Sequence, residues 1–318
     1  MREVIFTKKN KDKWLSFEEL LMSNRNIQPE ELTHIYLELT DDLSYAKTYY
    51  PDSKLTEYLN ELAGFAHRKI YKTKKESGNA IIRFYTKEFP LMFYPYRKYL
   101  LFSVIIFLLF VLIGAYSSAQ DENTIRLILG DSYVDMTLEN IRNGDPMAVY
   151  KQANEVDMFL GITINNIKVA LYTFIYGVLL GLGTLYMLMK NALMLGAFQY
   201  FFYSKNLLWE SVRTIWIHGT IEISVIIVAG AAGFVLASGI LMPGTYTRKQ
   251  AFSRKAKDGL KIMISTIPFF IIAGFFEGFV TRHTEMPDIL AIFIMSISLL
   301  MIVYYYFILP KRLKKSGL

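Results

Sequence analysis

Long apolar runs separated by charged segments occupy the chain from residue 100 onward. The first run, LLFSVIIFLLFVLIGAY at 100–116, carries no charged residue and is long enough to cross the hydrocarbon layer of a bilayer at about 1.5 Å per residue. Comparable runs follow at 167–189, 217–242, 262–280 and 289–309. This pattern predicts five membrane-spanning helices in the second part of the chain.

The segments between these runs indicate how the helices are oriented. The segment at 117–163 is rich in aspartate and glutamate, the segment at 247–261 holds six basic residues against Asp258, and residues 311–318 are basic as well. Basic segments beside spans stay in the cytosol, so the acidic segment is predicted outside and both termini inside. This requires one more crossing, for which NALMLGAFQYFFY at 191–203 is the candidate, although it is short. We therefore expect about six transmembrane helices.

The first part of the chain has the pattern of a soluble helical domain. It holds three stretches with apolar positions at helical spacing, and its basic and acidic residues nearly balance. Aromatic residues interleaved with basic ones follow, as in helices that lie at a membrane interface. The predicted fold is an all-α polytopic membrane protein with an N-terminal cytosolic helical domain. Its parts are a cytosolic helical head at 1–77, an interfacial juxtamembrane helix at 78–98, a transmembrane bundle at 99–310 with an extracytoplasmic acidic loop at 117–163, and a basic cytosolic tail at 311–318.

Composition narrows the classes of function. Hydrophobic residues make up 53% of the 318 residues, which favours a bilayer over an ordinary soluble domain. Cysteine is absent, so disulfides and thiolate chemistry are excluded. The sequence contains no Walker-type phosphate loop, GxSxG motif or kinase motifs. We therefore expect no enzyme activity and no cofactor, and we expect membrane lipids and partner proteins, rather than nucleic acid, as partners.

A small set of polar residues lies within the apolar runs or at their ends. Such residues are costly in hydrocarbon and are functional candidates by default. In the predicted topology they fall at similar depth near the extracytoplasmic face, and His218 and Glu222 share one helix face because they are one turn apart. The sequence thus predicts an intramembrane polar cluster, structural or binding and without catalytic residues, made of Asn165, Asn166, His218, Glu222, Glu277 and Arg282.

Three interpretations of this cluster remain open from the sequence. The side chains can fix the contacts between helices through hydrogen bonds, or they can line a pathway for a solute, a proton or a lipid. The third interpretation is a metal site formed by His218, His283, Glu222 and Glu277. Because the HExxH spacing of zinc proteases is missing, the expectation is that no metal is bound.

Small residues recur at helical spacing within the runs. Gly177 and Gly181 are four residues apart, as are Ala229 and Gly233, and small residues at this spacing let helix backbones approach closely. They predict tight packing inside the bundle or across a homodimer. Lys190 is expected at the cytosolic end of the second span, where its side chain can reach the interface.

Several segments resemble the stage II sporulation protein M family, a family of integral membrane proteins formerly described as a domain of unknown function. The resemblance extends over nearly the whole chain, with its most specific pieces at the Asn165 and Asn166 pair, at the HG-x-x-E of His218 to Glu222, and at the EGFVT that begins at Glu277. The segments are WLSFEELL, YPDSKLTEYLNELAGFAHRKIY, NNIKVALYTFIYGVLLGLGTLYMLMKNALMLGAF, HGTIEISVIIVAGAAGF and AGFFEGFVTRH. Asn191 is followed by Ala192 where the family is expected to have Asn-Gly.

The resemblance implies a multi-pass protein of the cytoplasmic membrane of a bacterium or archaeon. In spore formers the namesake is a non-enzymatic component that anchors enzymes of peptidoglycan remodelling. It thus implies a membrane scaffold that organises partner proteins, which would dock on the cytosolic head and on the acidic loop. The alternative hypothesis, from the residues themselves, is a permease-like or channel-like protein whose polar site is formed by His218, Glu222 and Glu277.

Overall fold

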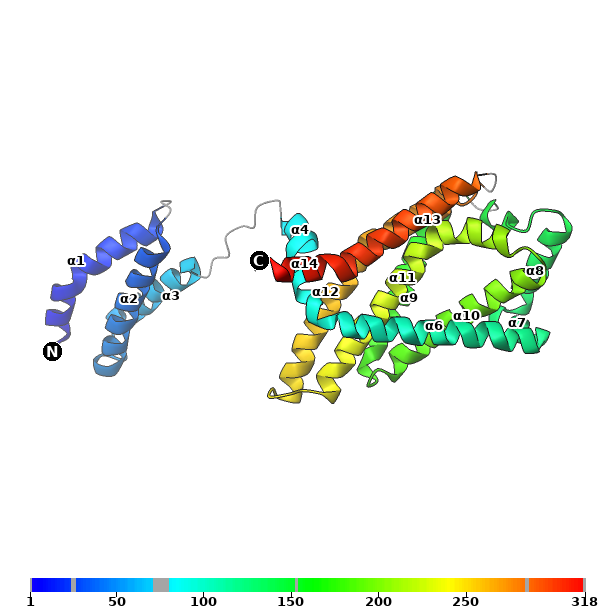
Figure 1. The fold of residues 1–318 in the computed structure, drawn as a ribbon. Helices are drawn as coiled ribbons and strands as arrows, with labels where there is room; N and C mark the ends of the chain where they lie inside the picture. Colours follow the sequence, from blue (N-terminus) through cyan, green and yellow to red (C-terminus); the bar gives the residue numbers. More distant parts are fainter. Residues whose placement is uncertain (1, 24–26, 71–79, 152–153, 284–285, 317–318) are drawn as a thin grey trace. The chain divides into compact units, whose positions relative to one another are not determined.

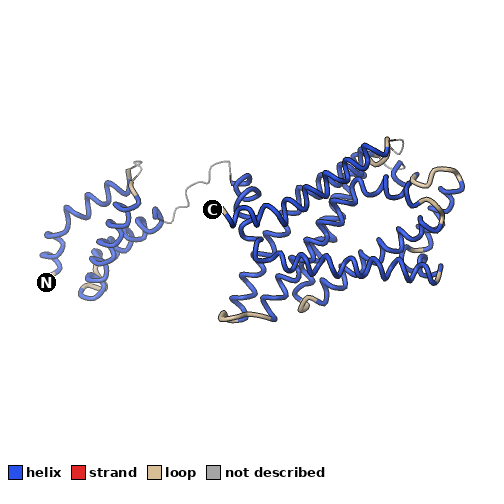
Figure 2. The backbone as a smooth tube through the Cα atoms, viewed as in Figure 1, coloured by secondary structure: helices blue, strands red, loops and turns tan. Residues whose placement is uncertain are grey.

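The computed structural model is helical throughout its described part, with short loops between helices (Figure 2). The chain divides into two compact units, Met1–Ala80 and Ile81–Leu318. The all-α class predicted from the sequence is confirmed. The described residues are 2–23, 27–70, 80–151, 154–283 and 286–316.

The first unit consists of three helices, α1 (Glu3–Met22), α2 (Pro29–Tyr49) and α3 (Lys54–Ile70). Proline at the first position of α2 suits a helix start, where its missing N–H is not needed. Large apolar side chains from the three helices form the core, with Trp14 and Leu59 nearly inaccessible to solvent.

The second unit begins with short helical segments that lead into a long helix. Within them, Phe89 and Phe93 are buried, and both rings contact Tyr306 near the end of the chain. The predicted interfacial helix therefore packs its aromatic side chains on the C-terminal helix. The segments are α4 (Ala80–Arg83), η1 (Phe84–Glu88), α5 (Phe89–Phe93), η2 (Tyr94–Tyr96) and α6 (Arg97–Gln120).

The remaining helices complete the bundle (Figure 1). Those of the acidic loop are α7 (Glu122–Leu129), α8 (Asp131–Arg142) and η3 (Ala148–Lys151). The others are α9 (Glu155–Ile175), η4 (Tyr176–Val178), α10 (Leu182–Ser204), α11 (Leu208–Leu241), α12 (Arg248–Phe275), η5 (Phe276–Val280), α13 (Asp288–Val303), η6 (Tyr304–Ile308) and α14 (Leu309–Lys315).

Five helical stretches of the described chain are long and apolar enough to cross a membrane. They are Ala80–Gln120, Glu155–Val178, Leu208–Leu241, Arg248–Val280 and Asp288–Lys315. Four of them match long runs in the sequence, whereas Glu155–Val178 overlaps only the first part of the run at 167–189.

The predicted helix at 167–189 is wrong, because a tight turn interrupts it. Leu180 and Gly181 both have positive φ, at 56° and 85°, and glycine adopts such a conformation without the steric cost of a Cβ. The chain reverses there, and α10 begins at Leu182 and runs for 23 residues, or about 34 Å at about 1.5 Å per residue. The short segment predicted at 191–203 is therefore the second half of a helix of ordinary length.

Polar contacts between helix ends define the two ends of the bundle. At the first, Lys205 Nζ lies 3.6 Å from Glu122 Oε1, and Trp209 Nε1 donates to Asp288 Oδ2 at 3.0 Å. These contacts join the start of α7, the end of α10 and the starts of α11 and α13, so we name this end the α7 end. At the opposite end, the Tyr96 hydroxyl donates to Asp258 Oδ2 at 2.6 Å.

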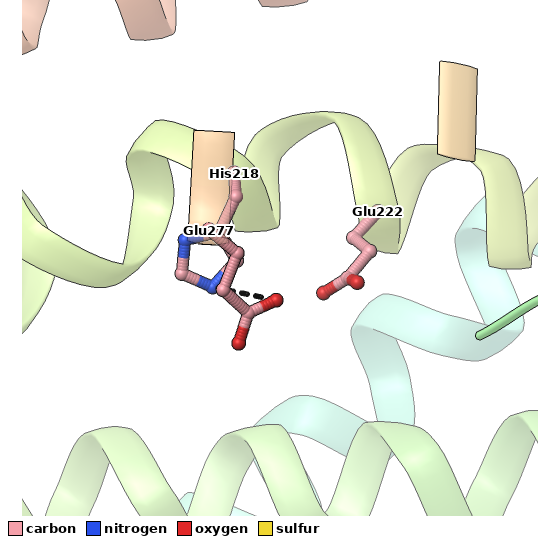
Figure 3. A group of neighbouring side chains, drawn as sticks. All are labelled: His218, Glu222 and Glu277. Atoms are coloured by element: carbon pink, nitrogen blue, oxygen red, sulfur yellow. Dashed lines mark ion pairs between the residues drawn. The ribbon is translucent and has the colours of Figure 1, made fainter. Parts of the chain in front are cut away.

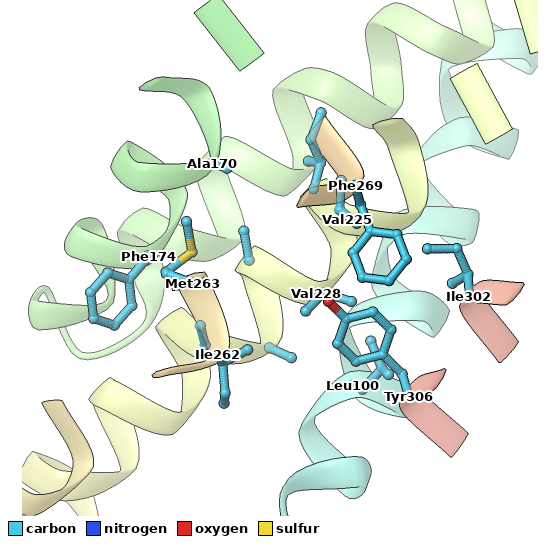
Figure 4. Packing of buried hydrophobic residues seen from close by; sticks show 14 of the residues in the cluster. Leu100, Ala170, Phe174, Val225, Val228, Ile262, Met263, Phe269, Ile302 and Tyr306 are labelled. Atoms are coloured by element: carbon cyan, nitrogen blue, oxygen red, sulfur yellow. The ribbon is translucent and has the colours of Figure 1, made fainter. Parts of the chain in front are cut away.

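Helix α11 is central to the bundle and buries mostly small side chains. Gly177 packs so closely on Gly233 that a Cβ at position 177 would overlap the Gly233 carbonyl oxygen. Ala229 is fully buried on α11, whereas Gly181 serves the turn before α10. Larger side chains from α6, α9, α12 and α13 fill the spaces around this helix (Figure 4). Three of the four small residues thus pack at the centre of one chain.

Candidate functional site

Three ionisable side chains meet in the interior of the bundle (Figure 3). His218 and Glu222 project from one face of α11, and Glu277 comes from the π-helical segment η5 at the end of α12. Such π-helical turns occur often at functional sites. One ligand atom from each side chain lies within 4.8 Å of the other two, so the cluster is compact.

The His218 ring is held between two partners. Its Nδ1 lies 2.9 Å from Thr281 Oγ1, and its Nε2 lies 3.7 Å from Glu277 Oε2. The residue is 3% exposed, so the ring has little room to rotate. The Thr281 contact orients the imidazole and directs Nε2 toward the carboxylate of Glu277.

The two carboxylates have oxygen atoms without a hydrogen-bond partner. Glu222 Oε1 and Glu277 Oε2 are buried, and neither makes a hydrogen bond with the described part of the chain. Leaving a buried acceptor unsatisfied costs about 1–3 kcal/mol, and more when the group is charged. A bound water, ion or solute at these oxygen atoms would remove this cost.

The cluster borders a cavity of about 530 Å³. Asn165 and Asn166 of α9 line it, as do Lys190 and Asn191 of α10. Tyr133 of α8 and apolar residues, among them Phe107 of α6 and Ile128 of α7, complete the wall. The cavity therefore extends from the three ionisable side chains toward the α7 end.

The structure brings five of the six predicted cluster residues to this cavity: Asn165, Asn166, His218, Glu222 and Glu277. Arg282 lies elsewhere, since its guanidinium contacts Glu155 Oε1 at 2.7 Å and joins the end of α12 to the start of α9. His283 is exposed and lies outside the compact group of His218, Glu222 and Glu277.

Lys190 and Asn191 are cavity residues that the sequence analysis did not assign. Lys190 was expected at the end of a helix, but it lies well inside α10. The error follows from the missed turn, because an apolar run through Leu179 and Leu180 hides the reversal. The glycines of GLG at 181–183 were the signal that could have located it.

These features define a helical membrane protein with a polar cavity among its long apolar helices. The chain belongs to the stage II sporulation protein M family, because the model of that family, described as "Stage II sporulation protein M", matches residues 103–282, more than half of the chain. The match contains His218, Glu222 and Glu277, and the resemblance seen in the sequence is confirmed for this part.

The head is matched separately. Residues 4–72 match a domain of unknown function, DUF8413, so the likeness of the head segments to the sporulation family is not supported by the family match. No curated protein and no solved structure matches the chain.

Proposed function

We propose that this protein is permease-like and admits a small cationic or protonatable solute to its intramembrane cavity. The observation that carries the proposal is the pair of buried carboxylates without hydrogen-bond partners in the described chain, on the wall of a cavity of ≈ 530 Å³. A pathway requires a cavity that reaches these side chains, whereas packing between helices requires no cavity.

The proposal includes a topology of six crossings with both termini in the cytosol. Helix α10 supplies the crossing that is needed in addition to the five long apolar helices, and it is the third crossing in chain order. Its length suffices for a crossing. Lys205, just after the end of α10, contacts Glu122, just after the end of α6, so both helices end on the same side of the bundle. The basic segment before α12 and the basic C-terminal residues favour the cytosol for the opposite end. The α7 end is then extracytoplasmic, and the cavity extends toward it.

The charges of the cavity favour a cation. Two carboxylates and one lysine line it, together with neutral amides and an imidazole. Amide and carboxylate oxygens both accept hydrogen bonds, which suits an ammonium group or a partly hydrated cation. An intramembrane ionisable group that borders a cavity is also a common element of proton pathways.

Flux of small cations into liposomes that contain the purified protein tests this proposal. The probes are protons with trapped pyranine, Mn²⁺ with trapped calcein, and radiolabelled methylammonium. We expect flux of at least one probe above protein-free liposomes, reduced at least tenfold by Glu222→Gln and by Glu277→Gln. The matched control is Glu210→Gln, on the same helix α11 but outside the cavity lining. Absence of flux for all three probes would overturn the proposal.

A membrane scaffold is the second candidate function, and the separate head favours it. The head has its own core and its own family match, as expected of a domain that binds a partner in the cytosol. The helices α7 and α8 of the acidic loop offer a second docking surface. Cross-linking of the native protein followed by mass spectrometry tests this candidate: reproducible partners at the head or loop support it, and recovery of the chain alone counts against it.

A further inference from the structure

We infer that His218, Glu222 and Glu277 together bind one divalent transition-metal ion, of the kind represented by Zn²⁺ or Mn²⁺, at the wall of the cavity. The inference rests on the same cavity as the proposed function, but it does not require that the ion, or anything else, is transported. It departs from the expectation drawn from the sequence, in which no metal is bound.

The spacing of the three side chains suits a shared ion. Two ligands at about 2.1 Å from one zinc ion, at the tetrahedral angle, lie about 3.4 Å apart. The His218 Nε2 and Glu277 Oε2 atoms are 3.7 Å apart, and one atom from each of the three residues lies within 4.8 Å of the others. Small side-chain rotations would therefore complete the ligand set, without movement of the helices.

The orientation of His218 has the form found in metal sites. A histidine that binds a metal through one ring nitrogen usually donates a hydrogen bond from the other, which fixes the tautomer and the ring plane. Here Nδ1 lies 2.9 Å from Thr281 Oγ1, which can accept this bond, while Nε2 faces the carboxylates. Thr281 itself is buried, so it serves as a fixed positioning residue.

The carboxylates provide a second and independent argument. Glu222 Oε1 and Glu277 Oε2 are buried without hydrogen-bond partners among the residues that the structure describes, and the two carboxylates point toward one another (Figure 3). Two ionised carboxylates so close together repel each other. A divalent cation between them removes the repulsion and satisfies both orphaned oxygens.

The ligand types indicate the class of ion. Imidazole nitrogen suits zinc, iron, copper and nickel, whereas Mg²⁺ and Ca²⁺ prefer sites made entirely of oxygen ligands. Three protein ligands leave at least one coordination position open, as in zinc sites that also bind water or substrate. The open position would face the cavity, where the amides of Asn165 and Asn166 lie.

The spacing also explains why no familiar motif is present. His218 and Glu222 supply a pair separated by four residues on α11, and the third ligand comes from η5, more than 50 residues later in the chain. The set differs from HExxH, in which two histidines have this spacing. Helical spacing places the first two ligands on one face, but the third depends on how η5 packs on α11.

Direct measurement of bound metal tests the inference. The detergent-solubilised full-length protein is stripped with EDTA, incubated separately with Zn²⁺, Mn²⁺, Mg²⁺ or Ca²⁺, desalted, and assayed for metal per chain and for its Tm. We expect one Zn²⁺ or Mn²⁺ per chain and a rise in Tm with that ion, and no comparable effect of Mg²⁺ or Ca²⁺. His218→Gln and Glu277→Gln should each weaken binding at least tenfold.

Three further variants separate ligation from folding. Thr281→Val should weaken binding about 10- to 100-fold, as expected for a residue that orients a ligand. His283→Gln and Glu210→Gln, an exposed histidine and a glutamate on the same helix outside the cavity, should bind as the wild type does. Each variant is accepted only if its circular dichroism matches that of the wild type.

The inference is overturned if the wild-type protein retains no ion, or if the His218 and Glu277 variants retain it. If the wild-type protein retains no ion, the two carboxylates share a proton or hold a solute directly. Failure of the proposed function gives a different result: an ion bound at full occupancy, together with no flux of any probe, would leave the metal site in place as part of a scaffold.

Discussion

The head and the bundle use helices in opposite ways. In the head, the large side chains of Trp14, Leu39 and Leu59 are inside and the polar residues are outside. In the bundle, large apolar side chains such as Leu112 and Ile289 are mostly exposed, while the centre around α11 is rich in glycine, alanine, serine and threonine. Water drives the first arrangement, whereas close backbone contact stabilises the second.

The two regions also differ in how they treat buried polar groups. In the head, Trp14 Nε1 donates to Asp42 Oδ2 at 2.7 Å, and Tyr58 donates to Glu18 Oε2 at 2.8 Å. Within the described ranges, every buried side-chain nitrogen or oxygen that lacks a partner belongs to the bundle. Two of these atoms, Glu222 Oε1 and Glu277 Oε2, belong to the candidate site.

The largest effect is expected from filling a backbone contact in the bundle. Gly177→Leu should prevent folding, with a loss above about 4 kcal/mol, because even its Cβ would overlap the Gly233 carbonyl oxygen. Size-exclusion chromatography in detergent should show aggregation in place of a single species. Gly161→Leu on α9 is the matched control, since a Cβ there meets open space. A monodisperse Gly177→Leu variant with unchanged Tm would refute the contact.

Emptying the core of the head should have a smaller and local effect. Leu39→Ala is expected to destabilise the head by about 2–5 kcal/mol, because Leu39 is fully buried. Trp14 fluorescence reports the unfolding once Trp209 and Trp216 are replaced with phenylalanine.

The control for this change is Leu37→Ala, in the same helix but 57% exposed, which should shift the transition little. Equal effects of the two substitutions would contradict the assigned core.

The features that could be predicted from the sequence depend on the local spacing of apolar residues and on the placement of charges. The sequence predicted four of the five long apolar helices, the all-α class, and a shared face for His218 and Glu222, because helical spacing determines these features. It missed the turn at 179–181 because leucines on both sides continue the apolar run, and that error misplaced Lys190. The approach of Glu277 to His218 depends on the packing of η5 against α11, which no local pattern encodes.

Removing a carboxylate of the candidate site is expected to stabilise the bundle, by less than the core substitution in the head destabilises the head. Without metal, Glu222→Met should raise the stability of the bundle by about 1–3 kcal/mol, since it removes a buried acceptor that has no partner within the described chain. The Tm is measured in EDTA. Glu210→Met is the control on the same helix and should give no such gain. Destabilisation by Glu222→Met in EDTA would indicate that the carboxylate is structural.

The smallest effect concerns the alkaline stability of the head. Burial, and then the hydrogen bond to the Glu18 carboxylate, raise the pKa of Tyr58 to about 12, above the ordinary value of about 10. Because the folded state holds this proton more tightly, the resulting stability is fully present below about pH 10 and is lost as the pH rises toward 12. Tyr58→Phe should therefore reduce the fall in the head's Tm between pH 10 and 12, which is measured by Trp14 fluorescence in the background without Trp209 and Trp216.

Tyr49→Phe, at an exposed tyrosine of the head, should leave that fall unchanged. An identical pH profile for Tyr58→Phe and the wild type would mean that the contact with Glu18 does not contribute to the stability of the head.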